Sequence, residues 1–310
     1  MPQFYTKLGL VLLLLVQTVF GQNHKVATED FVGQAELADK DVRAIFQDRN
    51  ANFWFGTRNS GVMRFDGKSW QAFTTEHGLL ANGILAIVED RAGAIWCAGG
   101  GGVQKFDDEK WTAFALKDDI GLNGRVVFAI REDADGRNWI GSSADASVFD
   151  GTSWQNYTTE QGLSHNVVHD VLAEASGTIW FATRKGGLSA FDDTAWQVHL
   201  QEANIRGLLL DDAGRLWAGT ASQGAYSLLR DGTWHRHAPH ETLIPKAVDR
   251  HGGVWFATEG AGAFRFYKQK WFHHTAADGL VSDVVYSIFE DRDGIIWLGT
   301  DLGVSQMQIQ

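Results

Sequence analysis

The sequence has a single cysteine and only three prolines, and it contains no run of basic residues. Cys97 therefore has no partner for a disulfide within the chain. Its place after Trp96 in an apolar segment predicts a buried, unreactive thiol and not a nucleophile. Lys and Arg number 27 against 38 Asp and Glu, which gives a net charge of −11. A chain of this charge, without a basic cluster, is not expected to bind nucleic acid.

The motifs of the common catalytic classes are missing as well. The chain contains no nucleophile elbow, Walker loop, HExxH or CxxC motif. Acidic pairs such as Glu89 with Asp90 carry the side chains that general acid–base catalysis uses. They recur at one position of a repeat, however, and this favours a structural role. We predict no catalytic residue and no cofactor, and the question of enzymatic activity stays open.

The longest apolar run lies at the N-terminus. Lys7 precedes an apolar run that ends at Val16, and the small residue Gly21 follows soon after. This pattern is typical of a cleaved signal peptide, and the run is shorter than the roughly 20 apolar residues of a membrane-spanning helix. We expect residues 1–21 to be removed. Residues 22–310 are then expected to form a single domain in the periplasm or outside the cell.

A unit of about 40 residues recurs seven times. Its core reads Asp, two residues, Gly, two residues, Trp, one residue, a small residue and usually Thr. The tryptophans of this first column are 37 to 43 residues apart, which is the period of a four-stranded propeller blade. They are Trp54, Trp96, Trp139, Trp180, Trp217, Trp255 and Trp297.

The other six tryptophans form a second column, 15 to 17 residues after the first. They are Trp70, Trp111, Trp154, Trp196, Trp234 and Trp271. Because all 13 tryptophans fall in these two columns, we interpret them as large rings that pack between neighbouring sheets and not as ligand-binding groups.

Turn residues separate the strands within each unit. An acidic residue stands six positions before each first-column tryptophan, and Gly stands three positions before it in every unit except the first. An Asp can hydrogen-bond its own turn, and a Gly can adopt positive φ, so each pair predicts a tight reversal between two strands. The first unit has Ala51 at the Gly position, and its turn is therefore expected to differ.

The first unit illustrates the predicted strands, which cover residues 42–47, 53–57, 62–65 and 70–74. Radial repetition of such sheets predicts an all-β fold, a seven-bladed β-propeller of four-stranded antiparallel blades. The seventh unit lacks the outer strand that a second-column tryptophan begins elsewhere. We expect residues 24–30 to supply this strand and so to close the ring.

Two segments resemble a known family of repeats. GLSHNVVHDVLAEASGTIWFAT, from Gly162 to Thr183, and GLVSDVVYSIFEDRDGIIWLGT, from Gly279 to Thr300, look like the two-component-regulator propeller repeat. The resemblance implies a periplasmic sensor region of the kind found in bacterial hybrid histidine kinases, many of which respond to oligosaccharides. It specifies the blade well and the ligand poorly, because the matching residues are turn and core positions.

The sensors of that family continue beyond the propeller into a further β-domain, a membrane helix and a kinase, whereas this sequence ends at Gln310. The expectation is a free-standing propeller that binds a ligand. Its partner would be a separate membrane sensor kinase or another exported protein.

Five histidines are the candidates for metal ligation. His235, His237 and His240 lie close together in one unit, and His273 and His274 lie in the equivalent strand of the next. Zinc and copper both use such ligands. These residues follow outer-strand tryptophans, where a solvated blade edge is expected, and we predict no metal site.

Antiparallel strand order places the residue after each Trp motif and the start of each inner strand on one rim of the ring. One residue into the seven inner strands lie Arg43, Leu85, Phe128, His169, Arg206, Ile244 and Tyr286. The residue types at this rim vary between units, which favours function over scaffold. The residues that we predict to bind a ligand are Arg43, Arg58, His169, Arg184, Arg206, Glu259, Tyr286 and Asp301.

Arginine offers fixed donors for carboxylate, sulfate or hydroxyl oxygens, so the predicted ligand is an oligosaccharide or another small polar molecule. Ordinary solvated loops are the competing interpretation of the rim. Two other functions stay open, a lyase or glycan-active enzyme with its acid and base in the mouth of the channel, and a protein-interaction scaffold.

Overall fold

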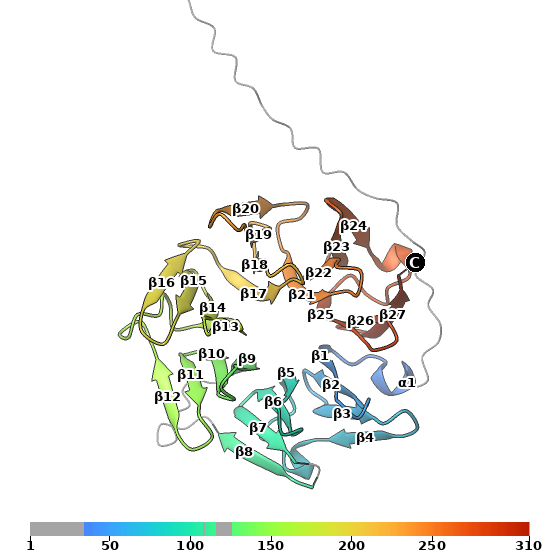
Figure 1. The fold of residues 1–310 in the computed structure, drawn as a ribbon. Coiled ribbons are helices and arrows are strands. Elements are labelled where there is room, and N and C mark those ends of the chain that lie inside the picture. Colours follow the sequence, from blue (N-terminus) through green and yellow to red (C-terminus); the bar gives the residue numbers. More distant parts are fainter. Residues whose placement is uncertain (1–33, 108, 116–125, 310) are drawn as a thin grey trace, which may run out of the picture.

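The computed structural model describes residues 34–107, 109–115 and 126–309, and they form a ring of seven antiparallel sheets (Figure 1). The predicted all-β, seven-bladed propeller is therefore confirmed. The predicted signal peptide and the predicted closing strand at residues 24–30 lie outside the described residues. Within the described part of the chain, no helix has the length and apolar character needed to cross a membrane.

The first four blades each contain four strands. Blade 1 consists of β1 (Val42–Gln47), β2 (Phe53–Thr57), β3 (Val62–Phe65) and β4 (Trp70–Phe73). Blade 2 consists of β5 (Ile84–Glu89), β6 (Ile95–Gly99), β7 (Gly102–Phe106) and β8 (Trp111–Ala115). Blade 3 consists of β9 (Val127–Glu132), β10 (Asn138–Ser142), β11 (Ala146–Phe149) and β12 (Trp154–Tyr157). Blade 4 consists of β13 (Val168–Ala173), β14 (Ile179–Thr183), β15 (Gly187–Phe191) and β16 (Trp196–His199).

The remaining three blades complete the ring. Blade 5 consists of β17 (Ile205–Leu210), β18 (Leu216–Thr220), β19 (Ala225–Leu228) and β20 (Trp234–His237). Blade 6 consists of β21 (Ile244–Val248), β22 (Val254–Ala257), β23 (Ala263–Tyr267) and β24 (Lys270–His274). Blade 7 has three strands in the described residues, which are β25 (Val285–Glu290), β26 (Ile295–Thr300) and β27 (Gly303–Gln308).

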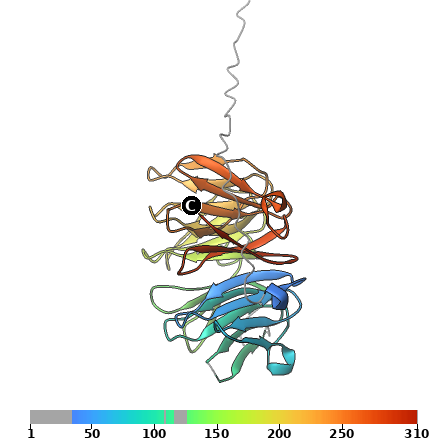
Figure 2. The ribbon, with the colours of Figure 1, turned by 90° about the vertical axis from the view of Figure 1, so that its right-hand side faces the viewer.

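The strands of each blade follow one another outward from the axis, so the first strands β1, β5, β9, β13, β17, β21 and β25 surround the centre of the ring (Figure 1). Seen edge-on, the ring is a disc (Figure 2). The first blade follows the prediction closely, except that β4 ends at Phe73. It ends there because the next residue, Thr74, caps the short helix η1 (Thr75–His77) by accepting a hydrogen bond from the backbone N–H of Glu76.

The acidic residue of each turn holds the first-column tryptophan as well as the turn itself. One carboxylate oxygen accepts a hydrogen bond from the indole N–H in all seven blades, at 2.7 to 3.0 Å. The pairs are Asp48 with Trp54, Asp90 with Trp96, Asp133 with Trp139, Glu174 with Trp180, Asp211 with Trp217, Asp249 with Trp255, and Asp291 with Trp297. The repeat thus satisfies a buried indole donor that apolar packing would leave unpaired.

The core lies between neighbouring blades. The seven first-column tryptophans are all buried, with at most 7% of their surface exposed. Trp139 of blade 3, for example, packs against Phe181 and Phe191 of blade 4, at ring-centroid distances of 5.7 and 6.2 Å. The predicted buried thiol is confirmed as well, because Cys97 is fully enclosed and this burial raises its pKa. The tryptophans therefore lie at the seams that hold the ring together.

The first turn has the same geometry as the others, and the expectation that it differs was wrong. Ala51 adopts φ of 66°, and its N–H donates to the carbonyl of Asp48 at 2.9 Å. Gly93 makes the equivalent bond to Asp90 at the same distance. The Asp48 side chain accepts two further N–H groups of the turn, from Asn50 and Asn52, and so holds Ala51 in a left-handed conformation.

We expect Ala51→Gly to stabilise the propeller. A left-handed residue with a Cβ is strained, and its relief by Gly should raise the free energy of unfolding by about 1 kcal/mol, less the entropy that Gly loses on folding. Thermal and urea unfolding of the variant would measure this. The matched control is Gly252→Ala at φ of 82°, where a new Cβ meets no atom within 4 Å and only the backbone strain is added. If Ala51→Gly lowers the midpoint of unfolding, the left-handed conformation of Ala51 does not destabilise the protein.

The described residues next to the ring closure join blade 7 to blade 1 on both faces. Helix α1 (Gln34–Leu37) precedes β1, yet Leu37 is buried against Trp297 and Val304 of blade 7. The N–H of Asp39 donates to the carbonyl of Leu302 at 3.1 Å. On the other face, Arg292 of blade 7 donates to the backbone carbonyl of the blade 1 turn at 2.7 Å. The chain therefore crosses the seam before its first strand begins.

Candidate functional site

Every blade has a β-bulge in its innermost strand. In blade 1 the pairing passes from Val42 with Thr57 to Ala44 with Gly56, so Arg43 has no partner in the ladder. The equivalent extra residue can be identified from the register of each other blade. The seven bulge residues are Arg43, Leu85, Phe128, His169, Arg206, Lys246 and Tyr286. A bulge turns a side chain away from the ordinary alternation of a strand, and bulges often lie beside functional sites.

All seven bulge residues line one cavity of about 230 Å³ at the centre of the ring, which we call the central cavity. Three more residues complete its wall, namely Ile244, Glu259 and Val285. Six blades contribute one bulge residue each from the same register position. The remaining blade, blade 6, contributes Lys246 from a different position. The central cavity is therefore a direct product of the repeat, whereas its chemistry is not repeated.

The structure brings five of the eight predicted site residues into this wall, namely Arg43, His169, Arg206, Glu259 and Tyr286. The other three, Arg58, Arg184 and Asp301, each follow the Trp motif of their blade on the same rim, but they do not line the cavity. The backbone explains the shared rim. The N–H of Arg58 donates to the carbonyl of Asp41 at 2.9 Å, and that of Arg184 donates to Val167 at 3.0 Å, so each motif end is tied to the start of an inner strand.

Lys246 was missed in the sequence because the bulge of blade 6 is displaced. In blade 1 the bulge residue lies three positions before the residue that pairs with the tryptophan, but Lys246 lies one position before Ala247, which pairs with Trp255. The predicted residue, Ile244, pairs with Ala257 instead. Pro245 directly precedes Lys246, and a proline inside a sheet is typical of a bulge. That proline was the signal in the sequence.

Arg43 is held in place from two sides. Its guanidinium donates to both carboxylate oxygens of Asp41, with Nη2 at 2.7 Å from Oδ2. Its Cζ lies 3.5 Å from the centroid of the Tyr286 ring, which is cation–π geometry. Arg58 also approaches Asp41, with Nη1 at 3.7 Å from Oδ2, but most of its side chain is exposed. Arg43 is therefore preorganised, and Arg58 is a solvent-exposed charge on the same rim.

Blades 4 to 6 contribute a second polar group. Arg206 donates to Glu259 through Nη2 at 3.1 Å. His169 packs beside Phe128, at a ring-centroid distance of 5.3 Å. Burial lowers the pKa of His169 to about 4, and the positive charges of Arg206 and Arg184 act in the same direction. His169 is therefore a neutral imidazole at neutral pH, and its buried Nε2 has no hydrogen-bond partner among the described residues.

Tyr286 completes the polar lining as a phenol. Burial raises its pKa, and the carboxylates of Asp41 and Asp301 also raise it, whereas Arg43 and Arg58 lower it. The cavity wall thus carries two arginines, one lysine and one carboxylate in a chain whose net charge is −11. Basic side chains outnumber acidic ones in this wall, the reverse of the whole chain, and such a lining suits anionic or hydroxyl-rich ligands.

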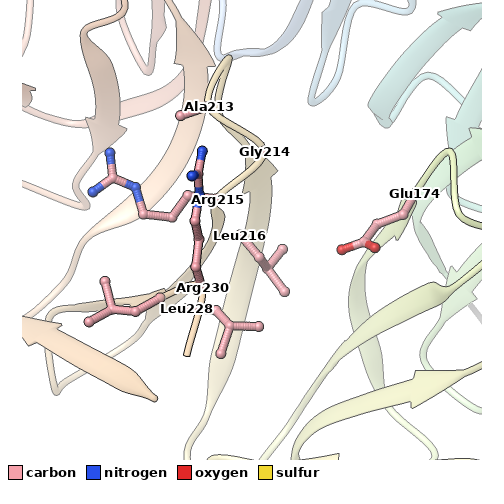
Figure 3. A pocket seen from close by; sticks show the side chains of 8 residues that line it. Glu174, Ala213, Gly214, Arg215, Leu216, Leu228 and Arg230 are labelled. Carbon is pink, nitrogen blue, oxygen red and sulfur yellow. The ribbon is translucent and has the colours of Figure 1, made fainter. Parts of the chain in front are cut away.

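A second pocket, of about 280 Å³, lies on the opposite face between blades 4 and 5 (Figure 3). Glu174 faces it from blade 4, and Arg215, Leu216 and Arg230 face it from blade 5. In blades 1, 2, 6 and 7 an arginine follows the turn Asp and bridges to the next blade, at Arg49, Arg91, Arg250 and Arg292. The residue after Glu174 is Ala175, which cannot make such a bridge across this seam.

Four of the five candidate histidines lie in the outer strands β20 and β24, and His240 lies in the loop after β20. His237 and His274 pack on the first-column tryptophans Trp217 and Trp255, and His273 stacks on Phe264 at a ring-centroid distance of 4.1 Å. In the described residues no group of three or more His, Cys, Asp or Glu is arranged to hold a metal ion. His237, His273 and His274 are therefore more enclosed than the solvated edge that their position in the sequence suggested, whereas His235 is exposed as expected.

Comparison with known proteins supports the repeat and the fold. The family model described as two component regulator propeller matches residues 279–301, within the seventh unit, and this confirms the predicted resemblance. No curated protein matches the sequence significantly.

Among solved structures, the chain is similar to the extracellular domains of two putative hybrid two component systems from B. thetaiotaomicron. The first is 20% identical with a TM-score of 0.77 over 89% of this chain, and the second is 19% identical with a TM-score of 0.75 over 93%. The chain spans 40% of the length of each. It is also similar to a catalytically inactive virginiamycin B lyase from Staphylococcus aureus with quinupristin, at 11% identity and a TM-score of 0.73, over 92% of this chain and 99% of that one. At these identities the similarity shows the fold.

Proposed function

We propose that this chain is an exported ligand-binding propeller of the sensor type, which recognises an oligosaccharide or a similar polar ligand in the central cavity. The observation that carries this proposal is the convergence of seven differing bulge residues on one cavity. The repeat holds their backbone positions constant while their side chains range from Arg to Leu to Tyr. Variation confined to one concave surface is expected of a recognition site.

The chemistry of the wall supports a sugar acid or another hydroxyl-rich anion. Arg43 and Arg206 offer planar donors to carboxylate, sulfate or hydroxyl oxygens. Tyr286 offers a ring face and a phenol, and His169 offers a neutral imidazole ring. Arg58, Arg184 and Asp301 lie around the entrance and would select among ligands that reach beyond the cavity.

The proposed location and partner of the protein are based on the similar structures and the matching repeat family. Extracellular domains of hybrid two component systems share the fold, and the seventh unit matches the corresponding repeat family. Together with the N-terminal signal-peptide pattern, this supports export to the periplasm or the cell exterior. It also supports a membrane sensor kinase, or another exported protein, as the signalling or uptake partner. The chain spans only part of those relatives, so each of these points belongs to the proposal.

Binding should depend on Arg206. A glycan array would identify the ligand, and titration calorimetry would then compare variants. We expect Arg206→Ala to weaken binding about ten-fold or more, because a charge-assisted hydrogen bond contributes about 1.5–3 kcal/mol. The fold should persist, since the Arg206 pair with Glu259 is largely exposed to water.

The matched control is Arg230→Ala, which removes an arginine from the second pocket on the opposite face. Its affinity should equal that of the wild type. If Arg206→Ala binds normally and Arg230→Ala binds weakly, the ligand occupies the pocket between blades 4 and 5. If no glycan and no other polar ligand binds, the scaffold function is favoured instead.

A second candidate function is that of a lyase, and His169 is the observation that favours it. A neutral imidazole in the wall of a cavity can act as a general base toward a bound substrate. The similarity to a virginiamycin B lyase extends over nearly the whole of that chain, though at low identity. Product analysis after prolonged incubation separates the two functions. Turnover that His169→Ala abolishes would support the lyase, and binding without turnover would support the sensor.

A further inference from the structure

Lys246 differs from the other cations of the central cavity. Arg43 pairs with Asp41 and Arg206 pairs with Glu259, whereas no ion pair or hydrogen bond of the Lys246 amine occurs within the described residues. Its side chain projects from the displaced bulge of β21 into the cavity and is reached by solvent there. It is therefore an unpaired primary amine in a site that otherwise suits anionic ligands.

The surroundings of Lys246 disfavour its protonated form. Enclosure by the surrounding protein lowers its pKa, although the residue as a whole keeps an exposed surface. Arg131 on β9 and Arg206 on β17 lower the pKa further, whereas Asp170 on β13 and Glu259 raise it. Asp170 is itself engaged, because one of its oxygens accepts the N–H of Leu208 at 2.9 Å. Desolvation and neighbouring cations are the two conditions that make a lysine nucleophilic.

We propose that Lys246 is a carbonyl-binding nucleophile, which forms an imine with the aldehyde or ketone group of an anionic ligand in the central cavity. This inference rests on the proposed function in that both use the same cavity. It narrows the ligand to one class, a carbonyl compound that also carries a carboxylate, sulfate or phosphate group. The guanidinium group of Arg206, whose charge acts on Lys246, binds the anionic group, and Lys246 lies in the same wall to meet the carbonyl carbon.

The step needs no external oxidant or reductant. The neutral amine of Lys246 attacks the carbonyl carbon, and a C–N bond forms. The two hydrogens of the amine leave with the carbonyl oxygen as one molecule of water, and a C=N double bond remains. Hydrolysis reverses the step, so the ligand can be released unchanged.

Pyridoxal 5′-phosphate is the probe for this site, because it joins an aldehyde to a phosphate. The full chain is incubated with the probe at neutral pH and reduced with borohydride, and the labelled lysines are identified by peptide mass mapping. We expect Lys246 to be labelled at least about ten-fold faster than Lys185, an exposed lysine of the same rim, because the cavity holds the phosphate of the probe and so raises the effective concentration of the aldehyde beside Lys246. Equal rates at the two lysines would overturn the inference.

Two variants and a second probe separate this inference from the proposed function. Lys246→Arg keeps the cation but removes the nucleophile, and it should abolish the imine absorbance, whereas Lys185→Arg should leave it unchanged. Pyridoxine 5′-phosphate carries the same phosphate without the aldehyde, and its binding should survive Lys246→Arg. If this second probe binds the wild type while Lys246 is not labelled, the imine is refuted and the anion site stands. If Lys246 is labelled but Arg206→Ala binds glycans normally, the imine stands and the proposed glycan site fails.

Discussion

Trp139→Ala is expected to lose about 3–5 kcal/mol of unfolding free energy, the range measured for removing a buried Trp. The side chain of Trp139 is fully buried, and it packs on Tyr157 of its own blade and on Phe181 and Phe191 of blade 4. Across the same seam Arg137 of blade 3 donates to both carboxylate oxygens of Asp193 of blade 4 at 3.1 Å, and the substitution leaves this partly exposed pair in place. Thermal unfolding followed by circular dichroism would measure the loss.

The matched variant Trp139→Phe keeps an aromatic ring in the seam and removes the indole N–H. Its loss should be nearer 1 kcal/mol, the net worth of one hydrogen bond, because Asp133 keeps its bond from Arg137 at 2.7 Å. If the Phe and Ala variants unfold together, the hydrogen bond matters more than the packing. If neither differs from the wild type, the tryptophan columns are not structural, and they would have to be reconsidered as binding residues.

The scaffold could be predicted from the sequence because its physical requirements repeat. A Trp every 37 to 43 residues, with an acidic residue six positions earlier, leaves little choice but a ring of four-stranded blades. The bond between the two residues was not predicted. Asp48 was interpreted as a turn residue, and it does accept turn N–H groups, but its other oxygen accepts the Trp54 indole. The spacing identifies the residues that recur, and only the structure identifies the hydrogen bond between them.

The candidate site was predictable only where it follows the repeat. Arg43, His169, Arg206 and Tyr286 occupy the same register position, so counting from each motif finds them. Lys246 does not, because the blade 6 bulge is displaced by two residues relative to blade 1. A displacement of this kind depends on how one strand pairs with the next, and period-based reasoning does not include it.

The division between scaffold and site also explains how the propeller can carry an unpaired lysine. Bulge residues are outside the ladder, so their side chains can change without breaking a backbone hydrogen bond. The turn Asp residues have no such freedom, since each already serves a turn and an indole. Function is therefore expected to change first at the seven bulge positions and last at the acidic column.

The acidic residue six positions before the first-column tryptophan is a buried charge in blades 5 and 6. In blade 6 it pairs with a buried arginine, and in blade 5 it pairs with a partly exposed one. Asp249 is fully buried and receives Arg265 from across the sheet, with Nε at 2.6 Å from Oδ2, and the Arg265 side chain is only 6% exposed. Asp211 receives Arg215 from its own turn at 2.9 Å, and the Arg215 side chain is 32% exposed. The two blades therefore allow a comparison of equivalent carboxylates, one paired with a buried cation and the other with a cation that water reaches.

Arg265→Leu is expected to destabilise the protein by about 3–5 kcal/mol at neutral pH, because it leaves the Asp249 carboxylate buried without its cation. Arg215→Leu, the matched control, should lose about 1–2 kcal/mol, since water shares the solvation of that pair. Urea unfolding of both variants would test the difference, and equal losses would show that burial does not set the strength of the pair.

The pH dependence of the Arg265→Leu variant gives an independent test. Burial alone raises the pKa of Asp249, but the bonds from Arg265, Gly253 and Trp255 outweigh it, and the pKa lies below the usual range. A lowered pKa contributes stability above the unfolded value and loses it as the pH falls through the folded value. Without Arg265 the burial effect dominates, so Asp249 should take up a proton at a higher pH than in the wild type. The gap in unfolding free energy between the two proteins should therefore shrink from about pH 7 to about pH 4. A gap that stays constant over this range would mean that the lost packing of the Arg265 side chain, and not the unpaired charge, causes the destabilisation.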